Sequence, residues 1–309
     1  MTTRIFIDGA AGTTGLEIRE RLEGREEFEL LVLGDSERKD EAARKEALHE
    51  ADVVILCLPD DAARDAVALA EGSNTRIIDA SSAHRVADGW TYGFPELIGQ
   101  DQVANAQFVS NPGCYPTGFL ALVAPLVSAG LLPADWPYTV NAVSGFSGGG
   151  KALIERFNEE LDLAWRGYGF GLNHKHLPEM RKYAGLAHTP VFSPAVVPAI
   201  RGMVVEIPLQ MNAIPSRPNC AQLRLALAEF ADTSPVITFD ASTDAPSEIL
   251  LNGSENPWDG MELALHASDD ETQARLVARL DNLGKGASGA AIQNLNIMCG
   301  LSETTGLRL

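Results

Sequence analysis

Short apolar runs alternate with helical patterns over the first third of the chain. The apolar runs are RIFID (4–8), FELLVLG (28–34), DVVILCLP (52–59) and TRIIDAS (75–81), and helical patterns fall at 13–24 and 61–71. Runs that are apolar on both faces are typical of strands in a parallel sheet covered by helices. The alternation therefore predicts an α/β fold with a doubly wound parallel sheet, which QFVSN (107–111) extends by one strand.

The rest of the chain follows a different pattern. β-rich stretches occur at 138–147, 202–211 and 260–268, and helical segments are expected at 220–231 and 270–284. We expect these segments to form a second, α+β domain with helices on one face of a sheet. The predicted boundaries are a first domain over 1–114, completed by the C-terminal helix in 286–309, and a second domain over 115–285.

Composition narrows the class of protein. The 309 residues carry a formal charge of −18, which argues against a nucleic-acid or anionic-membrane partner because both need a basic surface. No apolar stretch is long enough to span a bilayer or to act as a signal peptide, so we expect a cytoplasmic protein. The four cysteines (57, 114, 220 and 299) form no CxxC pair, so neither a zinc ribbon nor a redox dithiol is predicted.

The stretch DGAAGTTG places Gly9, Gly12 and Gly15 between the first strand and the first helix. Glycines there let the backbone approach a pyrophosphate, whose charge the helix N-terminus stabilises. The spacing is GxxGxxG and not the commoner GxGxxG, and a tight strand-to-helix turn is the alternative. In this context we interpret the stretch as the dinucleotide site of a Rossmann-type domain.

The loop after the second strand bears on the choice of coenzyme. In GDSERKD, Asp35 could bind the ribose hydroxyls, as in NAD sites. Ser36, Arg38 and Lys39 suit the 2′-phosphate of NADP instead. Three phosphate-compatible groups against one carboxylate favour NADP, and an ordinary solvated loop is the alternative.

The stretch NPGCYPTG puts Cys114 after the carboxyl end of the 107–111 strand and at the start of an apolar helix. Open α/β sheets bind ligands at that edge. A helix N-terminus also favours the thiolate, which is the nucleophilic form of cysteine. A buried structural thiol is an equally good interpretation of this stretch taken alone.

The stretch NHKHLPEM (173–180) brings His174, His176 and Glu179 close together. An imidazole titrates near neutral pH and a neighbouring carboxylate can fix its tautomer, which favours general acid–base chemistry. A metal site is disfavoured, because we expect Pro178 to disrupt a helix there and no other His or Cys cluster completes a ligand set. Surface histidines in a polar loop are the alternative.

Two further segments are candidates for binding an anion. SGFSGGGK (144–151) can form a nest of backbone amides over 147–150, although its glycines are equally consistent with a flexible turn. Arg201 lies in the apolar run PAIRGM (198–203), where a cation needs an anionic partner.

Taken together, the motifs resemble the N-acetyl-γ-glutamyl-phosphate reductase family in its shorter form, within the aspartate-semialdehyde dehydrogenase-like superfamily. The matching strings, in order, are GAAGTTG, DASSAHR, YGFPEL, NPGCYPTG, SGFSGGGK, HKHLPEM, PAIRGM and AIQNLNIMCGL. The resemblance implies an enzyme of arginine biosynthesis that uses NADPH to reduce N-acetyl-γ-glutamyl phosphate to N-acetylglutamate 5-semialdehyde. It also implies a thioester intermediate on the cysteine.

The resemblance implies roles for individual residues. Cys114 would be the nucleophile and His174 the proton shuttle, with His176 and Glu179 orienting it or the substrate. NADP would be bound by Gly9, Ala11, Gly12, Thr13, Thr14, Gly15, Ser36, Arg38, Lys39, Pro59, Ser81 and Asn294. The anionic substrate would be bound by Arg85, Asn111, Ser147, Gly148, Lys151 and Arg201.

Two other functions are the alternatives. One is a reductase of a related acyl phosphate, either aspartyl phosphate or a carrier-bound aminoadipyl phosphate. The other is a non-catalytic dinucleotide sensor, which would have no use for both a cysteine at a helix N-terminus and a histidine cluster. Family members are commonly dimers or tetramers, so we expect a homo-oligomer with a small anionic substrate and no metal, nucleic-acid or membrane partner.

Overall fold

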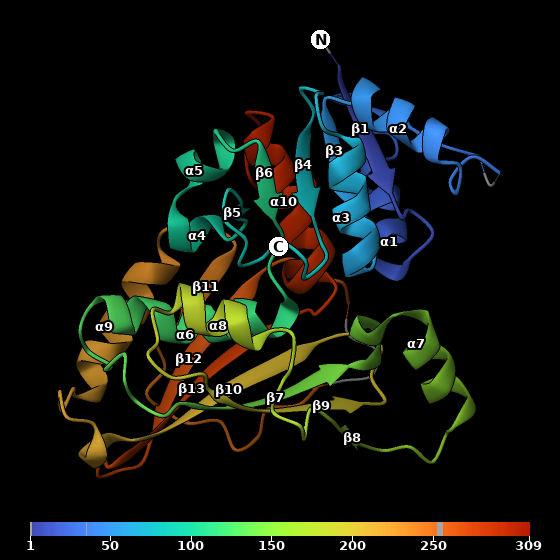
Figure 1. The fold of residues 1–309 in the computed structure, drawn as a ribbon. Helices are drawn as coiled ribbons and strands as arrows, with labels where there is room; N and C mark the ends of the chain where they lie inside the picture. The colour runs from blue at the N-terminus through green and yellow to red at the C-terminus, as the bar shows by residue number, and fades with distance from the viewer. Residues whose placement is uncertain (1, 35, 252–255) are drawn as a thin grey trace. The chain divides into compact units, whose positions relative to one another are not determined.

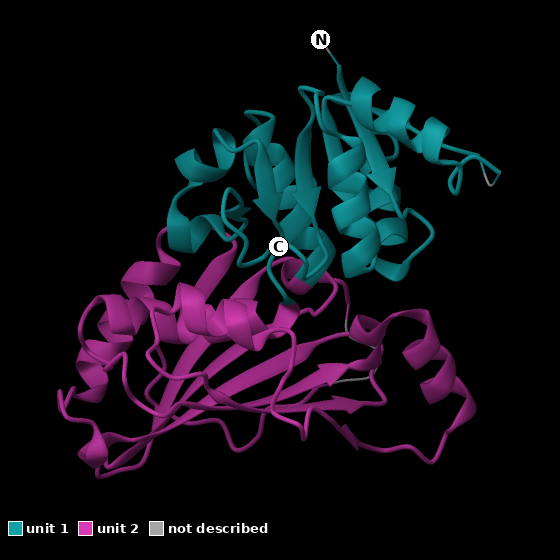
Figure 2. Ribbon diagram, viewed as in Figure 1, with its two compact units in different colours: residues 1–113, 287–307 teal, residues 114–286, 308–309 magenta. Residues whose placement is uncertain are grey.

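The computed structural model describes residues 2–34, 36–251 and 256–309. They form two compact units (Figure 1, Figure 2). Unit 1 comprises Met1–Gly113 and Ala287–Leu307, and unit 2 comprises Cys114–Gly286 and Arg308–Leu309. Within the described residues, no helix is both long and apolar enough to cross a membrane.

Unit 1 is a six-stranded parallel sheet with helices on both faces, which confirms the predicted doubly wound class. The strand order is β2-β1-β3-β4-β6-β5. The strands are β1 (Thr3–Asp8), β2 (Phe28–Leu31), β3 (Val53–Leu56), β4 (Arg76–Asp79), β5 (Thr91–Tyr92) and β6 (Phe108–Ser110). The helices are α1 (Thr13–Leu22), α2 (Glu41–Glu50), α3 (Asp60–Leu69), α4 (Pro95–Ile98), α5 (Gln100–Ala104) and α10 (Gly289–Met298).

Alternating side chains of the parallel strands fill two separate cores. In β1, Ile5 and Ile7 pack with α1 and α10, whereas Phe6 packs with α2 and α3 on the other face. Ile292 and Leu295 of α10 are fully buried in the first of these cores. Helix α10 therefore completes the core of unit 1.

Unit 2 contains a seven-stranded mixed sheet in the order β11-β12-β13-β10-β7-β9-β8. The strands are β7 (Thr139–Gly145), β8 (Arg166–Gly167), β9 (Val191–Val197), β10 (Met203–Gln210), β11 (Ile237–Asp240), β12 (Met261–Ala267) and β13 (Gln273–Leu280). The helices are α6 (Cys114–Ser128), α7 (Gly150–Glu159), α8 (Leu177–Tyr183) and α9 (Cys220–Ala231). Short helical turns span Phe146–Gly149, Met211–Ala213 and Gly284–Ser288. Helices α6, α8 and α9 lie on one face of this sheet (Figure 1).

The helix predicted over 270–284 is wrong. Most of this segment is strand β13, which pairs antiparallel with β10 and β12. Its alanines, leucines and arginines are good helix formers, which misled the prediction. Ala274, Leu276, Ala278 and Leu280 are buried while the intervening Arg275 and Arg279 are exposed, and this period of two is that of a strand on a half-covered sheet.

Gly118 lies where α6 meets the sheet, and it generates a test of the packing. A Cβ at this position would lie 2.9 Å from Cγ2 of Val205 and 3.4 Å from Cβ of Ala278. Alanine favours a helix by about 1 kcal/mol over glycine, but overpacking a core costs about 1–3 kcal/mol. We expect Gly118→Ala to lower the free energy of unfolding, measured by urea denaturation, by up to about 2 kcal/mol.

The matched control is Val205→Ala, alone and together with Gly118→Ala. The smaller side chain at position 205 removes the overlap. The loss in free energy of unfolding should therefore be smaller in the double variant than the sum of the losses in the two single variants. A Gly118→Ala variant that is more stable than the parent would contradict this account of the packing.

Candidate active site

The loop between β1 and α1 requires its glycines. Gly9 has a φ of +89°, and a Cβ there would lie 2.3 Å from the carbonyl oxygen of Cys57. A Cβ at Gly15 would lie 2.5 Å from the carbonyl oxygen of Gly9. Gly12 precedes the first turn of α1 and donates its amide to the Gly9 carbonyl oxygen. The backbone therefore carries no Cβ at three positions around the start of α1, which lets an anion approach the amides of the helix N-terminus.

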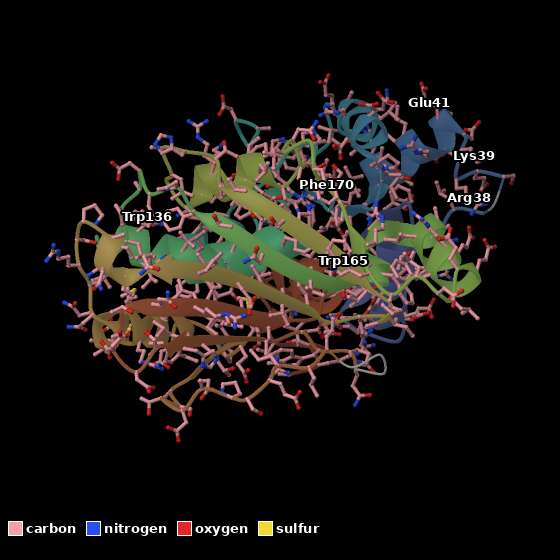
Figure 3. The ribbon with its side chains drawn as sticks, turned by 90° about the horizontal axis from the view of Figure 1, so that it is seen from below. Arg38, Lys39, Glu41, Trp136, Trp165 and Phe170 are labelled. Carbon is pink, nitrogen blue, oxygen red and sulfur yellow. The ribbon has the colours of Figure 1, made fainter. Side chains whose placement is uncertain are left out.

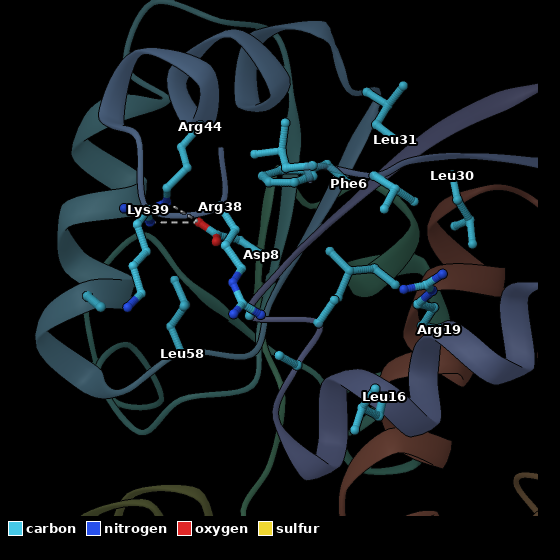
Figure 4. A pocket seen from close by; sticks show the side chains of 17 residues that line it. Phe6, Asp8, Leu16, Arg19, Leu30, Leu31, Arg38, Lys39, Arg44 and Leu58 are labelled. Atoms are coloured by element: carbon cyan, nitrogen blue, oxygen red, sulfur yellow. Dashed lines mark hydrogen bonds and ion pairs between the residues drawn. The ribbon is translucent and has the colours of Figure 1, made fainter. Parts of the chain in front are cut away.

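A cavity of about 680 Å³ opens beside this loop (Figure 4). Residues 9–11 form part of its lining, together with Arg38 and Lys39 from the turn after β2 and Arg44 from α2. Arg38 and Lys39 are exposed (Figure 3). Ser36 is exposed in the same turn and Asp35 lies outside the described residues. A cationic wall beside a glycine loop fits the phosphate-bearing adenosine end of a dinucleotide.

The remaining residues predicted to bind the cofactor follow other parallel strands. Pro59 precedes α3, and Ser81 is buried after β4. Asn294 of α10 is fully buried and donates to the carbonyl oxygen of Gly93 and to Oδ1 of Asn111. In the described part of the chain, Oδ1 of Asn294 has no hydrogen-bond partner. A buried acceptor of this kind fits a cofactor amide.

Arg85 binds the backbone of unit 1. It is 7% exposed, and its Nε and Nη2 atoms donate to the carbonyl oxygens of Asn111 and Ala80. The Asn111 side chain donates in turn to the carbonyl oxygen of Ala287. These bonds fix the segment that leads to Cys114. The guanidinium is buried against the backbone of unit 1, and the direct substrate contact stays a prediction.

In unit 2, α6 begins at Cys114, which confirms the predicted helix start. The helix N-terminus stabilises a thiolate there. Gly286 packs against this residue so closely that a Cβ at position 286 would lie 2.8 Å from Cβ of Cys114. Among the other thiols, burial raises the pKa of Cys57 to about 12 and also raises the pKa values of Cys220 and Cys299, which disfavours their thiolate forms.

The turn after β13 connects several of the predicted substrate residues. Asp281 accepts a hydrogen bond from Nη1 of Arg201 at 2.8 Å, and its carbonyl oxygen accepts from the amide of Gly286. Nδ2 of Asn282 donates to Oγ of Ser147 at 2.9 Å. Arg201 does meet an anion, as predicted, but in this structure that anion is a carboxylate of the protein. The turn after β13 therefore binds Arg201 and Ser147, and it also holds the segment that packs against Cys114.

Sequence reasoning missed Asp281, Asn282 and the 1% exposed Lys285. Asp281 and Asn282 fall within 270–284, which was predicted as a helix, so the turn after β13 was not recognised. The signal that could have found them is the Asp-Asn pair followed by two glycines at positions 284 and 286, since these residue types are typical of turns.

His174 and His176 lie in an aromatic cluster with Tyr115, the neighbour of Cys114. The two imidazole centroids are 4.6 Å apart, and the Tyr115 ring lies 6.2 Å from His174 and 5.8 Å from His176. Tyr168 lies 5.6 Å from His174, and its hydroxyl donates to the Tyr115 hydroxyl at 3.3 Å. The amide of His176 donates to Nδ1 of His174, so a neutral His174 ring carries its proton on Nε2.

The two tyrosines of this cluster, which sequence reasoning also missed, stay protonated at neutral pH. Burial raises the pKa of Tyr168 to about 12 and the pKa of Tyr115 well above its ordinary value. Negative charge on Cys114 raises both pKa values further, so the thiol is close enough to interact electrostatically with both phenols. Tyr115 lies within the NPGCYPTG stretch, whereas Tyr168 lies in none of the quoted motifs.

Pro178 starts a helix instead of disrupting one, which corrects the prediction. It lies in the first turn of α8, where proline is favoured because its missing amide is not needed. Glu179 follows it in the same turn and is 1% exposed. Lys151 is exposed at the start of α7, and Gly148 packs against the Asn282 side chain. In the residues that the structure describes, no three His, Cys, Asp or Glu side chains are grouped so as to hold a metal ion.

Two family models match the chain, one for each unit. The NAD binding domain of semialdehyde dehydrogenase matches residues 4–106, and the semialdehyde dehydrogenase dimerisation domain matches residues 114–282.

Solved structures agree on the fold. Aspartate semialdehyde dehydrogenase II from Vibrio cholerae, complexed with ASA, has a TM-score of 0.71 and 16% identity over 97% of this chain and 99% of that one. Aspartate semialdehyde dehydrogenase with NADP from Candida albicans has a TM-score of 0.66 and 17% identity over 97% of this chain and 99% of that one.

Curated relatives are much more similar in sequence. N-acetyl-gamma-glutamyl-phosphate reductase of Trichormus variabilis is 50% identical over 98% of this chain and 99% of that protein. The Chelativorans protein of the same name is 48% identical over 96% and 98%. N-acetyl-gamma-glutamyl-phosphate reductase 2 of Pseudomonas putida is 46% identical over 99% of each. On this similarity, the chain belongs to the N-acetyl-γ-glutamyl-phosphate reductase family.

Proposed function

We propose that this chain reduces N-acetyl-γ-glutamyl phosphate to N-acetylglutamate 5-semialdehyde, with Cys114 as nucleophile and NADPH as coenzyme. The observation that carries the proposal is the placement of Cys114 at the first residue of α6, with Gly286 packed against it. The names of relatives at 46–50% identity support the substrate. The cationic cavity beside the glycine loop supports NADP over NAD.

The reaction starts at the thiolate. The sulfur of Cys114 attacks the acyl carbon, the carbon–oxygen bond to phosphate breaks, and inorganic phosphate leaves a thioester on the enzyme. The cofactor, when bound, supplies the hydride that reduces this thioester. The resulting thiohemiacetal collapses to the aldehyde and returns the electron pair to sulfur, which restores the thiolate.

His174 assists through its Nε2–H in this scheme. This N–H shares its proton, through a hydrogen bond, with the oxygen that becomes negative when hydride reaches the thioester, and the ring keeps the proton when the thiohemiacetal collapses. His176 holds Nδ1 of His174 through its backbone amide, which fixes the tautomer that the step needs. The phenols of Tyr115 and Tyr168 remain hydrogen-bond donors beside the thiol because their pKa values are raised.

The proposed contacts of the substrate's carboxylate and phosphate remain Arg85, Asn111, Ser147, Gly148, Lys151 and Arg201. We also propose that the enzyme is a cytoplasmic homo-oligomer that associates through unit 2, which the dimerisation-domain match supports.

The reverse reaction tests the proposed function directly. N-acetylglutamate 5-semialdehyde, phosphate and NADP should give NADPH, whereas aspartate semialdehyde should be a much poorer substrate. Equal or faster turnover of aspartate semialdehyde would favour a related acyl-phosphate reductase, and no turnover of any aldehyde would favour a sensor.

Cys114→Ser tests the nucleophile. We expect this variant to lose turnover while its affinity for NADP is unchanged, because the thiol and the glycine loop belong to different parts of the chain. Iodoacetamide should label Cys114 before Cys57, Cys220 or Cys299, whose pKa values are raised by burial. Peptide mapping that finds another cysteine labelled first, or an active serine variant, would contradict the assignment.

His174→Asn separates a proton shuttle from a metal ligand. We expect the chemical step to slow by roughly 10²–10⁴-fold and to lose the pH dependence that an imidazole gives. NADP binding should be unchanged, and His176→Asn should cost less. Chelators should have no effect on the parent enzyme. Tightly bound zinc that disappears together with activity in the His174→Asn variant would overturn the proposal.

Arg38→Ala tests the choice of coenzyme. Loss of one charge-assisted contact to the 2′-phosphate should weaken NADP binding by about 1.5–3 kcal/mol and leave NAD binding nearly unchanged. Fluorescence titration of both coenzymes measures the effect. If the parent protein binds NAD and NADP equally well, the preference for NADP is wrong.

A further inference from the structure

A buried ion pair forms part of the wall of the cofactor cavity. Nε and Nη2 of Arg44 donate to Oδ2 of Asp8 at 3.1 and 2.7 Å. The Arg44 side chain is 17% exposed and the Asp8 side chain 7%. Both residues line the cavity, and Figure 4 shows the pair in the same region as Arg38 and Lys39. Neither residue of the pair was singled out from the sequence.

Stability alone gives no clear reason for this pair. Removing two charges from water costs several kcal/mol per ion, and an apolar pair of similar volume is often as stable. Asp8 is the last residue of β1, directly before Gly9, so an uncompensated carboxylate there would repel an anionic cofactor. Arg44 removes that repulsion and remains at the cavity wall.

The pair also fixes where the guanidinium points. A guanidinium has five N–H groups, and among the described residues the hydrogen bonds of Arg44 go to Asp8 through Nε and Nη2. Both N–H groups of Nη1 are therefore left for a ligand. Arg44 projects from the ten-residue helix α2, whereas Arg38 and Lys39 are exposed in a turn. A side chain that is already held loses less conformational entropy when it binds.

We propose that Arg44 is a pre-positioned ligand of the 2′-phosphate of NADP, held in place by Asp8, and that it contributes to the selection of NADP over NAD. The inference rests on the proposed function, because it assumes that the cavity takes this cofactor. With Arg38 and Lys39, Arg44 puts three cations on the side of the cavity that holds Asp8, so a dianionic phosphate is favoured there.

Arg44→Gln tests the inference by calorimetric titration of the full chain with NADP and with NAD. We expect the Kd for NADP to rise at least about tenfold, as for the loss of one charge-assisted contact, and the Kd for NAD to change less than about twofold. The double variant Asp8→Asn with Arg44→Gln removes both charges together. It should show the same loss of selectivity without leaving a buried carboxylate unpaired.

Arg64→Gln is the matched control. Arg64 lies on α3, is not among the residues that line the cavity, and pairs with Asp61 at 3.1 Å. This variant should bind both coenzymes like the parent. The inference is overturned if Arg44→Gln and the double variant change both Kd values by the same factor or change neither. A parent protein that prefers NAD would instead refute the proposed coenzyme.

Discussion

The buried carboxylate of Asp281 holds the candidate active site of unit 2 in shape. Its Oδ2 atom accepts from Arg201, its Oδ1 atom from the amide of Leu283, and its carbonyl oxygen from the amide of Gly286. A buried charge is costly without such partners, so the turn has little freedom to rearrange while the carboxylate stays ionised. The same turn sets Gly286 against Cys114, and the position of the thiol depends on it.

In each unit, residues that we expect to touch ligands also hold the backbone that presents the chemistry. Arg85 and Asn111 do this in unit 1 through carbonyl oxygens, and Arg201 does it in unit 2 through Asp281. These bonds pre-organise the loops and turns that carry the predicted ligand contacts. Pre-organised groups of this kind lower the cost of orienting a reacting molecule.

The sequence predicted the features that local chemistry determines. The glycine loop, the parallel strands and the start of α6 at Cys114 are set by residues within a few positions of each other. The partner of Arg201 lies 80 residues away, and no local pattern encodes it. The strand β13 was missed for the same reason, because pairing with β10 and β12 overrode the helix propensity of its residues.

The covalent thioester on Cys114 is the central claim, and intact-protein mass spectrometry tests it most directly. The enzyme is mixed with N-acetyl-γ-glutamyl phosphate in the absence of coenzyme, and the protein mass and released phosphate are followed together. The account predicts stoichiometric phosphate release with an N-acetylglutamyl group on Cys114, which disappears when NADPH is added. An active preparation that releases no phosphate and carries no adduct until NADPH is present would contradict it.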